Sequence, residues 1–292
     1  MSQKERTALI VGCGYVGRRL AQALSPTHRV AALVRSDKSR AALRELGVDN
    51  AMLDLDAPAS LRRLPREYSG CACLFYLAPP PAEGTSDARL DRFLRLIDAP
   101  PAAFVYMSTT GVYGDAQGEW VDESSKVAPR TERAQRRVSA EEMTRVWCHE
   151  REVRRVVLRV PAIYGPGRLP LERLRRGDPI VRLAESSPGN RIHVDDLVAA
   201  CVAAANNGDA RGAYNVVDDD HSSTSAFMLR VAQLARLPEP PQISLEEARL
   251  TFSAEQLSFL EESRRIDNRR LRTELCLQLQ YSNNDDGIRA SL

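Results

Sequence analysis

The chain has 292 residues, of which 43% are hydrophobic and 27% charged, enough to bury the core of one large α/β domain or of a domain with a smaller lobe. Its 41 basic and 39 acidic residues leave a net charge of +2, too small to indicate a nucleic-acid partner. No apolar run approaches the roughly 18 residues of a membrane span, so we expect a cytoplasmic protein with no membrane partner. Cysteine spacing indicates reduced thiols and no metal site; the cysteines are Cys13, Cys71, Cys73, Cys148, Cys201 and Cys276.

The first element is an apolar strand at residues 7–11, followed by a glycine-rich loop and a helix at residues 18–24. The loop, Gly12-Cys13-Gly14-Tyr15-Val16-Gly17, has the spacing G-x-G-x-x-G. Gly12 permits a tight turn, Gly14 allows close approach of a pyrophosphate, and Gly17 lets the helix pack against the strand. The same glycines would also suit an ordinary turn, but a strand before the loop and a helix after it favour dinucleotide binding.

Strands and helices then alternate along the chain. We predict strands at residues 29–34, 48–53, 71–77, 103–107 and 155–159, and helices at 39–46, 86–97 and 132–149. This order is typical of a Rossmann-type, doubly wound parallel sheet in an α/β fold, with residues 1–160 as its dinucleotide-binding domain. We expect residues 161–292 to complete the sheet and to form a small C-terminal substrate-binding lobe. That segment is predicted to hold a helix at 197–205, a strand at 213–217, a helix at 226–235 and a helical remainder.

Four blocks occur in a fixed order: the glycine loop, Met107 to Gly114 (MSTTGVYG), Leu158 to Gly167 (LRVPAIYGPG), and Arg191 to Asp196 (RIHVDD). Together they resemble the extended short-chain dehydrogenase/reductase superfamily, in its NAD-dependent epimerase/dehydratase branch, over about the first three quarters of the chain. The branch usually carries G-x-x-G-x-x-G, and Val11 stands where its first glycine would be, as in atypical members. The resemblance implies an NAD(P)-binding oxidoreductase or epimerase-like enzyme.

The resemblance also implies a set of catalytic positions. Family members use a Ser or Thr after the fifth strand and a Tyr-x-x-x-Lys pair on the next helix. Thr109 matches the hydroxyl position, but Arg133 stands at the Tyr position and Arg137 at the Lys position. Arginine cannot donate a proton near neutral pH. Tyr113 is a candidate substitute acid, although this tyrosine mostly packs at the active-site wall in the family. A catalytically inactive NADP(H)-binding sensor or scaffold is therefore the alternative to an enzyme.

Cofactor selectivity depends on the residues after the second strand. Arg35 and Ser36 replace the acidic residue of NAD-selective relatives and suit a 2′-phosphate, which predicts NADP. NAD stays the alternative, because a solvated surface arginine would also explain Arg35, and Asp37 could bind a ribose. The resemblance places further cofactor contacts at Asp54 and Leu55, at Leu77, Ala78 and Pro79, and at Pro161. Asp54 could instead cap a following helix.

The predicted partner is a small-molecule substrate, and the sequence leaves a homodimer open. Only 26 residues, 167–192, separate Pro166 from His193, and relatives that bind nucleotide-sugars have a longer insertion there. We therefore expect a substrate smaller than a nucleotide-sugar. The arginines of that segment could bind a substrate carboxylate or phosphate. For His193 we expect a structural hydrogen bond, and for residues 218–221 an acidic loop without metal.

Overall fold

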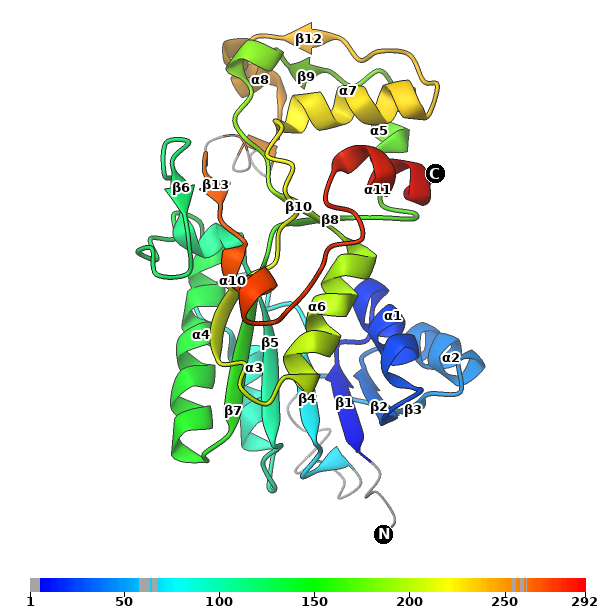
Figure 1. The fold of residues 1–292 in the computed structure, drawn as a ribbon, viewed down its shortest axis with the longest axis vertical. Helices are drawn as coiled ribbons and strands as arrows, with labels where there is room; N and C mark the ends of the chain where they lie inside the picture. The colour runs from blue at the N-terminus through cyan, green and yellow to red at the C-terminus, as the bar shows by residue number, and fades with distance from the viewer. Residues whose placement is uncertain (1–5, 58–63, 65–67, 254–255, 258–259, 261) are drawn as a thin grey trace.

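The computed structural model describes residues 6–57, 64, 68–253, 256–257, 260 and 262–292. Its centre is a seven-stranded sheet in the order β11-β7-β5-β4-β1-β2-β3, and every neighbouring pair is parallel (Figure 1). The strands are β1 (Thr7–Val11), β2 (Arg29–Val34), β3 (Asp49–Met52), β4 (Cys73–Tyr76), β5 (Ala103–Thr109), β7 (Arg154–Val160) and β11 (Gly212–Asn215). The predicted Rossmann-type α/β fold is confirmed.

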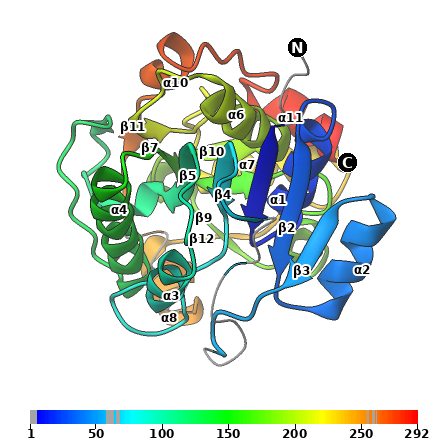
Figure 2. The ribbon, with the colours of Figure 1, turned by 90° about the horizontal axis from the view of Figure 1, so that it is seen from below.

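Helices cover both faces of this sheet (Figure 2). One face packs against α1 (Tyr15–Leu24), α2 (Asp37–Glu45) and α6 (Val194–Asn206), and the other against α3 (Ala88–Arg95) and α4 (Glu132–Glu150). Strand β4 is apolar without alternation because both of its faces are buried. Phe75 packs in the core on the first face, and Leu74 and Tyr76 pack in the core on the second. Among the described residues, no helix combines the length and the apolarity that a membrane crossing requires.

Polar side chains fix where most of these helices begin. The Ser36 hydroxyl accepts a hydrogen bond from Ser39 N (3.3 Å), Asp87 accepts one from Leu90 N (3.0 Å), and Thr131 caps α4 in the same way. Helix α1 differs, because its N-cap is Gly14 and no side chain caps it. The first N–H groups of α1 therefore have no side-chain acceptor at the helix end and suit an external anion.

Most of the chain after residue 160, apart from α6 and β11, forms a second layer above the carboxyl ends of the sheet strands (Figure 1). Its elements are β8 (Ala162–Tyr164), α5 (Leu171–Arg175), β9 (Ile180–Val181), β10 (Arg191–His193), α7 (Thr224–Leu234), β12 (Gln242–Ile243), α8 (Leu245–Thr251) and α11 (Asn284–Ser291). A separate core holds this lobe together, with Tyr164, Leu174, Phe227 and Ile288 buried in it.

Two short strands correct the prediction that the remainder of the chain is helical. Strand β12 pairs with β9, and β13 (Arg265–Ile266) pairs with β6 (Trp120–Val121). Each has only two residues, so it carries no periodic pattern. These strands exist because residues far away in the sequence supply their hydrogen-bonding partners.

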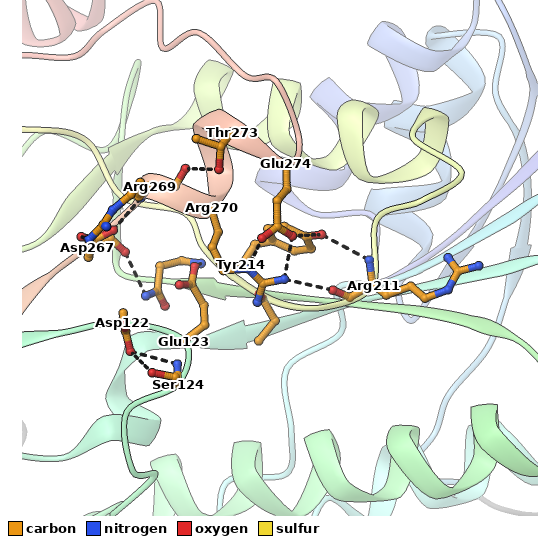
Figure 3. A network of polar contacts seen from close by, with 12 residues as sticks. Asp122, Glu123, Ser124, Arg211, Tyr214, Asp267, Arg269, Arg270, Thr273 and Glu274 are labelled. Carbon is orange, nitrogen blue, oxygen red and sulfur yellow. Dashed lines mark hydrogen bonds and ion pairs between the residues drawn. The ribbon is translucent and has the colours of Figure 1, made fainter.

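The last strand of the sheet, β11, is covered by α10 (Arg269–Thr273) (Figure 3). Arg270 donates to the carbonyl of Ala213 (2.9 Å) and pairs with Glu274 (2.7 Å), which accepts a hydrogen bond from the Tyr214 hydroxyl (3.1 Å). An uncovered edge strand would offer free backbone groups to other chains. The C-terminal segment thus covers one edge of the central sheet.

Candidate cofactor and active site

A pocket of about 460 Å³ lies at the carboxyl ends of β1, β2, β3 and β4. Strand β1 lies between β2 and β4 in the sheet, so the direction of chain progression reverses here. Open α/β sheets bind ligands at this point. The wall includes Gly12, Cys13, Gly14, Tyr15, Val16, Gly17, Arg35, Ser36, Ser39, Leu55, Asp56, Leu77, Ala78, Pro79, Arg89, Met107, Ile163 and Arg168.

Two positions of the loop require or accept glycine for different local reasons. Gly12 has φ +87°, and a Cβ there would lie 2.5 Å from Ala78 N, so the loop can approach the turn after β4 only without a side chain. Gly14 faces open space, with nothing within 4 Å of a Cβ placed on it, and it lies in the pocket wall. The first turn of α1 contains no acidic residue. The loop therefore fits an anionic group such as a pyrophosphate.

The pocket contains a charged cluster at the ends of β2 and β3. Arg35 lies 3.5 Å from Asp56 with 66% of its side chain exposed, and Asp56 forms a bidentate pair with Arg89 (2.6 and 2.7 Å). The hydrogen bond from Arg89 lowers the pKa of Asp56 below its usual value. Asp56 therefore stays ionised, and Arg35 is the exposed cation of the cluster. The Ser36 hydroxyl caps α2 beside it.

Asp54 lies outside this pocket wall, in contrast to Leu55 and Asp56. Its carboxylate accepts a hydrogen bond from Asp56 N (2.9 Å), so it shapes the turn that brings Asp56 into the pocket. The helix that Asp54 was alternatively expected to cap would fall on residues outside the described part of the chain.

Thr109 is the last residue of β5, two positions beyond Met107 in the pocket wall. Its hydroxyl oxygen accepts a hydrogen bond from Gly111 N (3.2 Å). A hydroxyl that accepts from the backbone still has its own proton to donate. Thr109 itself lies outside the pocket wall, and its bond with Gly111 leaves the hydroxyl proton available to another acceptor.

Arg133 and Arg137 lie one turn apart on α4. Arg137 Nη1 donates to the carbonyl of Met107 (2.9 Å) and to the Tyr106 hydroxyl (3.2 Å), and Arg133 is half-buried. Both lie outside the pocket wall, but Arg137 holds the strand end from which Met107 enters it. The two arginines give this helix face positive charge and hydrogen-bond donors beside the pocket.

Tyr113 is only 3% exposed and lies in a buried network outside the pocket wall. Its hydroxyl donates to Asn215 Oδ1 (2.7 Å) and accepts from Arg159 Nη1 (3.0 Å), and Arg159 pairs with Glu141 (2.8 Å). Burial raises the pKa of Tyr113 above its usual value. The structure therefore speaks against Tyr113 as the substitute acid, because its proton is already committed to Asn215.

Sequence comparison agrees with the site. Residues 8–217 match the family described as "NAD dependent epimerase/dehydratase family". The chain belongs to this family. Protein YeeZ of Escherichia coli (strain K12) is 28% identical over 93% of this chain and 95% of its own length. The structure of a functionally unknown conserved protein from Silicibacter pomeroyi DSS is 29% identical, with a TM-score of 0.80 over 98% of this chain and 97% of that chain.

The human epimerase family protein SDR39U1 (isoform 2), solved with NADPH, shares the fold at 18% identity, with a TM-score of 0.77 over 98% of this chain and 98% of that chain.

Several residues of the pocket wall could not be predicted from the sequence. Asp56, Arg89 and Ile163 belong to this group, because they reach the pocket only through the packing of β3, α3 and β8. Pro161, predicted as a contact, lies outside the wall, two residues before Ile163.

The surroundings of His193 and of the loop at residues 218–221 are given by their burial and hydrogen bonds. His193 is fully buried at the start of α6, where its Nδ1 accepts from Asp195 N (3.2 Å) and its Nε2 contacts the Ser291 hydroxyl (3.2 Å). Asp218 is buried, and burial raises its pKa to about 8. Among the described residues, no cluster of three or more metal-ligating side chains occurs.

Proposed function

We propose that this epimerase/dehydratase family member binds NADP(H) and acts as an oxidoreductase or epimerase-like enzyme on a small substrate. The supporting observation is the pocket at the reversal point of the sheet, where the glycine loop and the exposed Arg35 share one wall. Asp37, the alternative ribose ligand, lies outside that wall with 91% of its side chain exposed. Arg35 therefore favours a 2′-phosphate over a bare ribose.

In this proposal, the open end of α1 and Gly14 bind the pyrophosphate, and Arg35 with the hydroxyl of Ser36 binds the 2′-phosphate. The bound nicotinamide supplies or accepts hydride. Thr109 donates a hydrogen bond to the reacting substrate oxygen and so favours negative charge on it. Arg137 positions the end of β5, because it holds the Met107 carbonyl.

A small substrate is supported by the content of residues 167–192, which form α5, β9, the short helix η3 (Leu183–Glu185) and the start of β10. Four arginines of the segment pair with nearby carboxylates: Arg173 and Arg176 with Asp178, Arg175 with Glu172, and Arg182 with Glu185. Arg168, another arginine of the segment, lines the pocket.

The second candidate is an NADP(H)-binding protein without turnover. The predicted alignment, which puts Arg133 at the family's acid position, supports it. So does the hydrogen bond from the Tyr113 hydroxyl to Asn215. The two candidates share the cofactor site and differ in whether the pocket can deliver a proton to a substrate.

Two measurements test the proposal. Thermal melts with NADP and NAD come first, because a ligand at a hundredfold its Kd stabilises by about 2.7 kcal/mol. We expect a larger shift with NADP. Turnover is then followed by the absorbance of reduced nicotinamide over a panel of small carbonyl compounds, with Thr109→Val as the matched variant.

Turnover that falls with Thr109→Val supports the enzyme. An epimerase returns its hydride and leaves the absorbance unchanged, so each reaction is also analysed for an epimerised product. NADP binding with neither an absorbance change nor such a product supports the sensor or scaffold. Calorimetry with nucleotide-sugars in the presence of NADP tests the substrate size, and micromolar binding of a nucleotide-sugar would contradict it.

A further inference from the structure

The pocket wall contains one arginine from the lobe. Arg168 follows β8 and lies in the same wall as Gly12, Gly14 and Tyr15 of the glycine loop. Within the part of the chain that the structure describes, no hydrogen bond or ion pair engages its guanidinium. The five N–H donors of this side chain are therefore available to a ligand.

The position of Arg168 is fixed by its contact with the glycine loop. Its guanidinium lies over the ring of Tyr15, 4.2 Å from the ring centroid. The Tyr15 hydroxyl donates to the Pro166 carbonyl (2.9 Å), and Arg168 N donates to the Gly165 carbonyl (2.9 Å) in the same turn. A cation held against an aromatic face keeps its edge free for planar hydrogen bonding.

Gly165 shows how closely the two parts approach each other. Its φ is +150°, and a Cβ there would lie 2.7 Å from the Tyr15 hydroxyl and 2.6 Å from Val194 Cγ1. The turn that carries Arg168 thus packs directly on the first residue of α1. The lobe and the candidate pyrophosphate site meet at this contact.

Tyr15 contacts a second arginine with a different role. Arg19 lies over the same ring at 4.1 Å, but it donates to the Tyr15 carbonyl (3.2 Å) and lies 3.9 Å from Asp195. Arg19 is outside the pocket wall. The two arginines share the aromatic contact, and only Arg168 combines it with open donors in the pocket.

We propose that Arg168 is the lobe's contribution to the cofactor site, where it binds the pyrophosphate of the dinucleotide together with the N–H groups of the glycine loop. This inference rests on the proposed dinucleotide function. It assigns Arg168 to the cofactor, whereas its place in the segment 167–192 suggested a substrate contact. The cofactor then bridges the sheet and the lobe.

The test is calorimetry on the full chain with NADP, NAD and 2′-AMP, which lacks a pyrophosphate. We expect Arg168→Ala to weaken NADP and NAD by about tenfold each, the effect of losing charge-assisted hydrogen bonds, and to leave 2′-AMP unchanged. Arg19→Ala is the matched control, because it removes the other arginine from the Tyr15 ring. It should leave all three affinities within about twofold.

Three outcomes would contradict the inference. Equal losses in Arg168→Ala and Arg19→Ala would assign the effect to Tyr15 packing. Unchanged NADP and NAD binding in Arg168→Ala would remove Arg168 from the site, and an equal loss for 2′-AMP would place it at the other phosphate. If the unaltered protein binds none of the three ligands, the proposed function fails as well, which distinguishes that failure from the first three.

Discussion

Gly12 and Gly14 are two residues apart in one motif, yet the structure predicts opposite consequences for replacing them with alanine. In Gly12→Ala, the new methyl carbon would lie 2.5 Å from Ala78 N and 2.6 Å from Ala78 Cα, against 3.4 Å or more for ordinary contact. The turn after β4 would have to move by about 0.9 Å. In Gly14→Ala, the methyl group would extend into open space in the pocket.

The two costs can be estimated. For Gly12→Ala, a positive φ costs about 1–2 kcal/mol and the overpacking about 1–3 kcal/mol, so we expect roughly 3 kcal/mol less stability. That corresponds to a fall in Tm of roughly 5–10 °C. Gly14→Ala should destabilise the protein less than Gly12→Ala, because its φ is −89° and the added methyl group meets no neighbour.

The order should be reversed for dinucleotide binding, which Gly14→Ala affects directly. Gly14→Ala fills the space that the pyrophosphate would use, so saturating NADP should no longer raise the Tm of this variant. The assay is a thermal melt of each variant with and without saturating NADP. A Gly14→Ala protein that NADP stabilises fully, or a Gly12→Ala protein with an unchanged Tm, would refute the assignment of the two glycines.

Three further predictions concern charged residues. Arg35→Ala should weaken NADP binding about fivefold to tenfold in calorimetry and leave NAD binding unchanged, since only NADP has the 2′-phosphate. The control is Arg44→Ala, at the far end of α2. Equal losses of affinity for both cofactors would contradict NADP selectivity. Arg137→Ala should weaken NADP binding, because it releases the Met107 carbonyl at the pocket wall; unaltered affinity would show that α4 does not support the cofactor site. Asp218 has a folded-state pKa of about 8, above its ordinary 3.8, so the folded protein binds a proton more tightly than the unfolded chain and stability should fall as pH rises from 4 to 8. In urea unfolding at pH 5 and pH 8, Asp218→Asn should remove on the order of 2 kcal/mol of this dependence, and an identical pH profile in the variant would disprove the role of Asp218.

The candidate catalytic residues could be assessed from the sequence only in part. Motif spacing singled out Thr109 and the two arginines of α4 as candidates, and all three lie outside the pocket wall. It could not decide the role of Tyr113, since the partners of its hydroxyl, Asn215 and Arg159, lie 102 and 46 residues away. Whether a tyrosine is a free acid or a buried donor depends on such distant partners.

The sequence by itself determined the sheet and the glycine loop. Apolar strands and amphipathic helices are set by local periodicity, and the G-x-G-x-x-G spacing needs only neighbouring residues to form its turn. The tertiary structure decided which charges share the pocket. Asp56 lines the wall and Asp54 does not, Arg89 reaches the wall from α3, and Arg168 reaches it from the lobe. Charged side chains carry no periodic signal, and their partners are set by how separate elements pack, so these contacts exist only in the folded chain.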